Sequence, residues 1–163
     1  MLRSFHRVCG CARNPDTDSH ATQYFAAECV RMGYRVSTQE FPVRSSLSEN
    51  VICTKDGAGP NNAAKGSVVV GAHLDSTSQT PATLAPGAND NGSGAMAVLE
   101  MMRATAAAKF RETVQFVAFG GEEQGLYGSK YFVEEAGRQG QVIKSALVCG
   151  NFDIISRHFP RLS

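Results

Sequence analysis

Hydrophobic residues first recur at helical spacing between residues 17 and 33 of the chain. Apolar side chains fall three and four positions apart in TDSHATQYFAAECVRMG, a spacing typical of an amphipathic helix. Asp18 or Ser19 can cap the N-terminus of this helix, and Gly33 can end it. The pattern therefore predicts one helix over 17–33.

The hydrophobic period then shortens to two, which is typical of β-strands. The stretch YRVSTQEF (34–41) alternates between apolar and polar residues, and ENVICTK (49–55) is its predicted hairpin partner. The stretch DGAGPNNAAK (56–65) is rich in turn-forming residues and predicts a surface loop.

Further along the chain, short apolar runs alternate with helical segments. Buried strands are predicted for SVVVGAHLD (67–75), ETVQFVAFGG (112–121) and SALVCGNFD (145–153). Helices are predicted between them, at 92–108 and 126–137. Strands that alternate with helices in this way predict an α/β sheet with parallel central strands.

Composition narrows the class of protein further. A length of 163 residues suits a single domain, 1–163, with a helix and hairpin at 17–54 and a core that holds the candidate site at 67–155. The net charge of +1 excludes a strongly basic surface for nucleic acid. No apolar run approaches the roughly 20 residues of a membrane span. The first residues lack the apolar stretch of a signal peptide, so the sequence indicates no compartment.

The cysteines do not form a recognisable metal-binding set. There are five, so at least one is unpaired: Cys9, Cys11, Cys29, Cys53 and Cys149. Cys9 and Cys11 form a C-x-C pair that could bind a metal or pair elsewhere. No second pair completes a zinc knuckle, and ordinary thiols are therefore favoured.

Acidic and histidine residues lie at the C-terminal end of each of the three predicted buried strands. They are His73 and Asp75 at the end of the first strand, Asp90 before the helix at 92–108, Glu122 and Glu123 at the end of the second strand, and Asp153 at the end of the third. In open α/β sheets, ligands bind beyond the carboxyl ends of the strands. The topology therefore predicts that these side chains meet at one sheet edge.

So many carboxylates at one edge require a cation, because close like charges disfavour one another's ionisation. No cluster of Lys or Arg stands beside them in the sequence. A mixture of His, Asp and Glu ligands suits a pair of zinc ions, with manganese or cobalt as substitutes. Two ions about 3.5–4 Å apart need a bridging carboxylate. Asp90 fits that position because its neighbours are small and a helix N-terminus follows it.

Each of these residues taken singly has an ordinary structural explanation. His73 could be an ordinary capped histidine of the core or surface, Asp75 a turn residue, and Asp90 an N-cap within a plain turn. The Glu122–Glu123 pair could be a solvated helix start, and Asp153 could simply end its strand. Their predicted convergence on one sheet edge favours the metal site over these separate explanations.

Four motifs in this region resemble the di-zinc exopeptidases of the bacterial leucyl aminopeptidase type. They run in family order from residue 68 to residue 155: VVVGAHLDS, GANDNGSGAMAVLEMMR, VQFVAFGGEEQGLYGSKYF and GNFDII. Glutamate carboxypeptidases and glutaminyl cyclases are more distant relatives in the same clan. The resemblance implies a three-layer α/β/α fold around a mixed, centrally parallel sheet.

The resemblance also implies a set of metal ligands. His73 and Asp153 would bind the first zinc, Glu123 would bind the second, and Asp90 would bridge the two. In the family the bridging aspartate precedes a cis peptide bond, here Asp90–Asn91.

Two further residues receive roles from the resemblance. Asp75 would orient His73 by accepting its ring N–H, which fixes the tautomer of the ring. Glu122 would be the general base that takes a proton from a zinc-bridged water and passes it to the leaving amine.

The resemblance ends shortly after Asp153. Family members supply a second histidine for the second zinc, an oxyanion-stabilising tyrosine and most of the substrate pocket from much further along the chain. This sequence stops at Ser163, and His158, its one downstream histidine, is not expected to be a ligand. The second zinc site is then left with Asp90 and Glu123, and the expected fold is incomplete at its C-terminus, with apolar surface exposed.

The sequence therefore predicts a zinc metallopeptidase, an aminopeptidase that acts on peptide substrates without nucleic acid or membrane partners. One alternative is a catalytically inactive remnant or interaction module of the same fold. A second alternative is an acyltransferase of the glutaminyl cyclase kind, although the NDNGSG and GGEEQGLYGS stretches favour a peptidase.

Overall fold

A mixed five-stranded sheet forms the middle of the fold in this computed structural model, which describes residues 15–59, 66–80 and 84–150. The strand order across the sheet is β1-β2-β4-β3-β5. Strands β1, β2 and β4 pair antiparallel, whereas β4, β3 and β5 pair parallel. The strands are β1 (Arg35–Val43), β2 (Ser46–Lys55), β3 (Ser67–His73), β4 (Thr113–Phe119) and β5 (Ile143–Val148). The predicted sheet with parallel central strands is confirmed.

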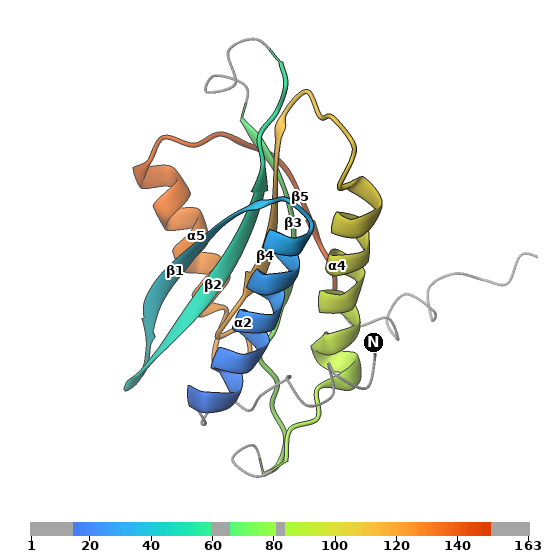
Figure 1. Cartoon of the computed structure of the whole chain (residues 1–163). Helices are drawn as coiled ribbons and strands as arrows, with labels where there is room; N and C mark the ends of the chain where they lie inside the picture. The colour runs from blue at the N-terminus through green and yellow to red at the C-terminus, as the bar shows by residue number, and fades with distance from the viewer. Residues whose placement is uncertain (1–14, 60–65, 81–83, 151–163) are drawn as a thin grey trace, which may run out of the picture.

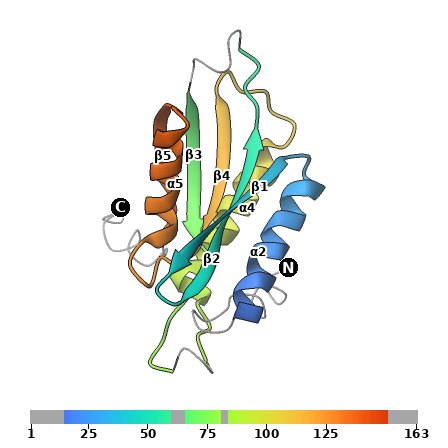
Figure 2. The same ribbon diagram turned by 90° about the vertical axis from the view of Figure 1, so that its left-hand side faces the viewer.

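Helices cover both faces of this sheet (Figures 1 and 2). Helices α2 (Pro15–Arg31) and α4 (Gly94–Thr105) lie on one face, and α5 (Tyr127–Arg138) lies on the other. The result is the predicted three-layer α/β/α arrangement. In the described part of the chain, no helix is both long and apolar enough to cross a membrane.

Alternation along β4 explains why both faces of the sheet need cover. Val114 and Phe116 belong to the apolar cluster beneath α2 and α4, whereas Val117 and Phe119 pack in a second cluster with Phe132 of α5. Successive residues of a strand point to opposite faces, so an apolar run such as TVQFVAF supplies side chains to both clusters. The two cores hold β4 between the helical layers.

The first helix differs slightly from its predicted bounds. It begins at Pro15 rather than residue 17, and it ends at Arg31, two residues before Gly33. Proline is favoured at the first helical position because its missing N–H would have no intrahelical partner there. Gly33 has φ 80°, a conformation open to glycine at little cost, and the chain turns there into β1.

A disulfide that the sequence did not predict joins the helical layer to the sheet. Cys29 of α2 bonds to Cys53 of β2, with their Cα atoms 5.9 Å apart. Both side chains are fully buried within the cluster beneath α2 and α4. The crosslink closes a 24-residue separation in sequence and ties α2 to the second strand of the hairpin.

The third predicted buried strand is the least accurate of the predicted elements. The sequence predicted a buried strand at 145–153, but β5 covers Ile143–Val148 and most of its side chains are exposed. Leu147 and Val148 are 54% and 66% exposed. Within the described residues β5 is an edge strand and pairs only with β3, so its apolar residues lack cover. The expectation of exposed apolar surface is confirmed at this edge.

Candidate metal centre

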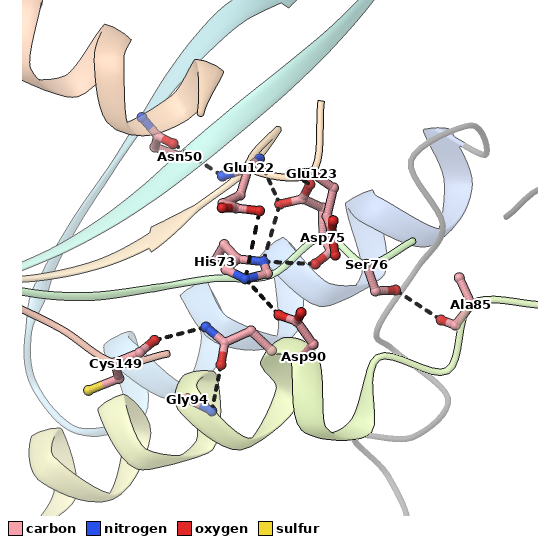
Figure 3. A network of polar contacts seen from close by, with 12 residues as sticks. Asn50, His73, Asp75, Ser76, Ala85, Asp90, Gly94, Glu122, Glu123 and Cys149 are labelled. Carbon is pink, nitrogen blue, oxygen red and sulfur yellow. Dashed lines mark hydrogen bonds and ion pairs between the residues drawn. The ribbon is translucent and has the colours of Figure 1, made fainter. Parts of the chain in front are cut away.

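Two neighbouring parallel strands, β3 and β4, deliver the candidate residues to one edge of the sheet. His73 is the last residue of β3, and it lies beside Phe119, the last residue of β4. Asp75 follows directly after β3, and the Glu122–Glu123 pair follows β4. Figure 3 shows these side chains and Asp90 gathered around the His73 ring. The predicted convergence of these five residues is therefore what the structure shows.

The imidazole of His73 has polar partners on both of its nitrogens. Its Nδ1 lies 3.0 Å from the backbone carbonyl oxygen of Asp75. Its Nε2 lies 3.2 Å from Oδ1 of Asp90 and 4.0 Å from Oε2 of Glu122. The side chain is only 13% exposed, so these contacts replace much of the water around the ring.

This geometry determines where the ring carries its proton. A carbonyl oxygen can only accept, so the contact to Asp75 requires the proton on Nδ1. A neutral His73 then has a bare lone pair on Nε2, which faces a carboxylate oxygen of Asp90 at 3.2 Å. Two lone pairs at that distance repel unless a positive charge lies between them. The contact is therefore favourable only with a positive charge between the two groups, which is either a proton shared by His73 and Asp90 or a metal cation.

The carboxylate of Asp75 has a different partner from the one the resemblance implied. It lies 3.7 Å from Nδ1 of His73, outside hydrogen-bond distance, because the backbone carbonyl of Asp75 takes that position. Its two oxygens instead accept the backbone N–H groups of Glu122, at 3.1 Å, and of Glu123, at 3.0 Å. Asp75 is 4% exposed, and it joins the end of β3 to the segment that carries both glutamates.

Asp90 stands on an irregular turn, η1 (Ala88–Ser93), that leads into α4. The Asp90–Asn91 peptide bond is cis, as the resemblance implied. The side chain of Asn91 accepts the N–H of Gly94, at 3.0 Å, and donates to the carbonyl of Cys149, at 2.8 Å. Asn91 thus ties the turn to the end of β5, while the carboxylate of Asp90 remains 56% exposed toward the site.

Asn91 was not singled out from the sequence, although a local signal was present. Asparagine is among the preferred residues at helix N-termini because its oxygen accepts free backbone N–H groups. The bond to Cys149 had no such signal, since it joins residues that lie 58 positions apart.

The crowding of carboxylates at the site affects the pKa of Glu123. Burial raises the pKa of the Glu123 carboxyl, and the nearby carboxylates of Asp90, Asp75 and Glu122 raise this pKa further. His73 opposes the shift. Among the described residues, no Lys or Arg forms an ion pair with Asp90, Glu122 or Glu123.

Two histidine or acidic residues considered from the sequence lie outside the described residues, namely Asp153 and His158. Over the ranges 15–59, 66–80 and 84–150, no group of three or more His, Cys, Asp or Glu side chains is assembled tightly enough to hold a metal ion. The described residues therefore place the two glutamates near the His73–Asp90 pair. Asp153 stays a predicted ligand.

A cavity of about 630 Å³ adjoins the polar residues. His73, Asp90 and Glu122 line its polar end, and apolar side chains of β3, β4, α5 and β5 line the rest. A mostly apolar hollow with a few polar groups at one end is typical of ligand-binding sites. The site therefore opens onto space that a substrate side chain could enter.

Curated proteins from bacteria resemble this chain over most of its length. Aminopeptidase YwaD of Bacillus subtilis is 35% identical over 120 residues, which cover 73% of this chain and 24% of YwaD. Leupeptin-inactivating enzyme 1 of Streptomyces exfoliatus is 35% identical over 141 residues, which cover 84% of this chain and 29% of that enzyme. The chain thus spans less than a third of the length of these two relatives.

A solved structure shares the fold. The Zn-dependent exopeptidase of Parabacteroides distasonis superposes with a TM-score of 0.72 at 18% identity, over 90% of this chain and 57% of that one. The sequence model of Peptidase family M28 matches residues 50–161, which include every strand that delivers a candidate residue to the site. By this match over more than half of its length, the chain belongs to peptidase family M28.

Proposed function

We propose that this chain carries the active site of a zinc-dependent aminopeptidase. The observation that supports the proposal most strongly is the His73–Asp90 contact, in which Nε2 of the imidazole faces a carboxylate oxygen at 3.2 Å. A cation between the two groups would turn this repulsion into attraction from both sides. Imidazole and carboxylate together suit zinc.

A metal ion accounts for the site better than a second proton on the ring. One imidazolium charge would balance one carboxylate, but three carboxylates gather here, from Asp90, Glu122 and Glu123. Burial and the neighbouring carboxylates raise the pKa of Glu123. No basic side chain from the described ranges pairs with any of the three. A divalent ion supplies more positive charge and can contact several oxygens at once. The chemistry of these donors, imidazole and carboxylate, thus supports the proposal of zinc.

The residues that would hold zinc are His73, Asp90 and Glu123, together with Asp153. Asp75 would act through its neighbours: its carbonyl fixes the tautomer of His73, and its carboxylate holds the backbone of both glutamates. Because the carbonyl of Asp75 contacts Nδ1, Nε2 of His73 is left to bind a cation. When bound, zinc would lower the pKa of a coordinated water and polarise the peptide carbonyl.

Glu122 would move the proton. Its carboxylate stands 4.0 Å from Nε2 of His73, too far for a hydrogen bond, and the side chain is 36% exposed. A carboxylate in that position can accept a proton from an attacking water and later donate the proton to the leaving amine. Glu122 would therefore be the general base, and the other residues would bind the metal.

The assignment to an aminopeptidase rests on the relatives. YwaD, which is 35% identical over 120 residues, is named an aminopeptidase. The apolar cavity beside His73 and Glu122 gives the side chain of a terminal residue a place to bind. The choice of an N-terminal residue rests on the name of that relative, whereas the cavity supports only the binding of an apolar side chain.

The test compares metal-free and zinc-loaded chain on leucine p-nitroanilide, with the N-acetylated reporter as a matched control. The proposal predicts hydrolysis of the free-amine reporter, loss of that activity on chelation and recovery with added zinc. It also predicts no hydrolysis of the acetylated reporter, because an aminopeptidase recognises the free amine. Activity that survives full chelation would contradict the proposal. A folded, zinc-loaded chain that hydrolyses neither reporter would instead support an inactive member of the family.

A further inference from the structure

A buried side chain on β2 contacts the segment that carries the two glutamates. Asn50 is fully buried, and its Oδ1 accepts the backbone N–H of Gly120, at 3.2 Å. Its Nδ2 donates to the carbonyl of Gly128, at 2.9 Å, and to Oε1 of Gln39, at 3.2 Å. Figure 3 shows Asn50 beside the strand end that leads into Glu122. Within the described part of the chain, the hydrogen bonds of Asn50 reach none of the candidate metal ligands.

Gly120 and Gly128 mark the two ends of this segment, which we call the glutamate turn (residues 120–128). The N–H of Gly128 donates to the carbonyl of Gly120, at 3.1 Å, and closes the turn across its base. A Cβ atom on Gly128 would lie 2.2 Å from the Gly120 oxygen and 2.4 Å from Oδ1 of Asn50. The base of the turn is therefore packed so closely that no side chain fits beside Asn50.

The glutamate turn is thus held at two places by two polar side chains. Asn50 bonds to both ends of its base, and Asp75 accepts the N–H groups of Glu122 and Glu123 further along it. Both side chains are buried, so solvent does not compete strongly for these bonds. The backbone of Glu122 is fixed between these two anchors, although its carboxylate is partly exposed.

Asparagine is an unusual choice for this position. It is depleted in strands, and a buried carboxamide is unfavourable unless its hydrogen-bonding groups are satisfied. Neighbouring Val51 and Ile52 follow the ordinary apolar pattern of a buried strand. The hydrogen-bonding groups of the Asn50 carboxamide are satisfied mainly by the glutamate turn, whose last residue lies in α5. These bonds indicate that Asn50 holds the turn in place.

We infer that Asn50 is a positioning residue for the general base, and the inference rests on the proposed function. By fixing the base of the glutamate turn, Asn50 holds the Glu122 backbone at the place where its carboxylate faces the site beside His73. Without the carboxamide, the turn keeps its bonds to Asp75 but loses the side chain that joins its base to β2. Glu122 then samples positions from which proton transfer is slow.

The test uses Asn50→Ala with Val51→Ala as the matched control. Val51 is the next residue of β2 and is also fully buried, but it packs in the cluster beneath α2 and α4, away from the glutamate turn. Both variants lose buried contacts on one strand, and only Asn50→Ala loses bonds to the turn. A merely structural effect would therefore appear in both.

The first measurement is amide hydrogen exchange, which needs no activity. Asn50→Ala is expected to raise the exchange of the Glu122 and Glu123 amides, relative to amides of β3, by about tenfold or more. In Val51→Ala the same ratio stays within about twofold of the parent chain. A ratio that is unchanged in Asn50→Ala, or that rises equally in Val51→Ala, would overturn the inference.

The second measurement is steady-state kinetics of the zinc-loaded chain on leucine p-nitroanilide. Asn50→Ala is expected to lower kcat by about 10–100-fold with little change in KM, since misplacement of a reacting group affects the chemical step. Val51→Ala keeps the parent kcat. A parental kcat in Asn50→Ala would overturn the inference, whereas a parent chain that hydrolyses nothing would refute the proposed function and leave the exchange result to decide the placement of the turn.

A second variant separates the two bonds that Asn50 makes to the glutamate turn. Asn50→Asp keeps an oxygen that can accept from Gly120 and replaces the donor that faces the Gly128 carbonyl. The inference predicts faster exchange at the first turn of α5, with the Gly120 amide protected to within about threefold of the parent. Equal loss of protection at both places would overturn it.

Discussion

Glu122→Gln is expected to lower turnover of leucine p-nitroanilide by about 10²–10⁴-fold, the contribution that a positioned acid–base group makes. Glutamine has nearly the same shape as glutamate, but its carboxamide cannot accept the proton from an attacking water. Zinc content is expected to stay near that of the parent chain, because Glu122 is not a ligand in this account. The measurements are kcat and the zinc-to-protein ratio of the same preparation.

Glu134→Gln is the control for this substitution. Glu134 lies exposed on α5, outside the site, so the same chemical change there should leave both turnover and zinc content unaltered. A Glu122→Gln chain that holds its zinc and keeps substantial activity would remove Glu122 from the general-base role. A chain that loses zinc would show that Glu122 is a ligand instead.

His73→Ala has the second large expected effect, a loss of zinc affinity of at least about 100-fold. Removal of a residue that merely supports a ligand costs 10–100-fold in affinity, and His73 would be the ligand itself. The substitution removes the only imidazole that faces the Asp90 carboxylate in the described part of the chain. Titration of metal-free chain with zinc against a chelating dye measures the change.

His20→Ala is the matched control, since His20 lies exposed on α2, away from the site. Its zinc affinity should equal that of the parent chain. If His73→Ala binds zinc as tightly as His20→Ala does, the metal is held elsewhere and the assignment of His73 is wrong.

Local sequence pattern was sufficient for most of the fold. The apolar run TVQFVAF in β4 supplies side chains to both faces, as a central strand must, and it was predicted as buried. Because β3 and β4 are parallel neighbours, their carboxyl ends place His73 beside the glutamate turn. The order of strands and helices was thus enough to predict that His73 and the two glutamates lie at the same edge of the sheet.

Features that depend on a distant partner were not predictable from the same pattern. SALVCGNFD has the composition of a buried strand, yet burial of β5 depends on cover that the described residues do not provide. Cys29 and Cys53 carry no mark of their pairing until α2 packs on β2. The bonds of Asn50 to the glutamate turn likewise join positions that lie 70 and 78 residues apart.

At the site, too, the sequence pattern predicted which residues lie close together but not which of their atoms interact. The resemblance implied that the carboxylate of Asp75 would accept the ring N–H of His73, but in the structure the backbone carbonyl of Asp75 lies at hydrogen-bond distance instead. That exchange frees the carboxylate to bind the glutamate turn. Residue type and spacing predict which groups are near one another, whereas the choice between two oxygens of one residue depends on backbone geometry.

X-ray diffraction at the zinc absorption edge, from crystals of the zinc-loaded chain, tests the central claim most directly. The account predicts an anomalous peak about 2.0–2.1 Å from Nε2 of His73, in contact with the carboxylate of Asp90. A folded, zinc-saturated chain in which no ion touches both His73 and Asp90 would contradict it.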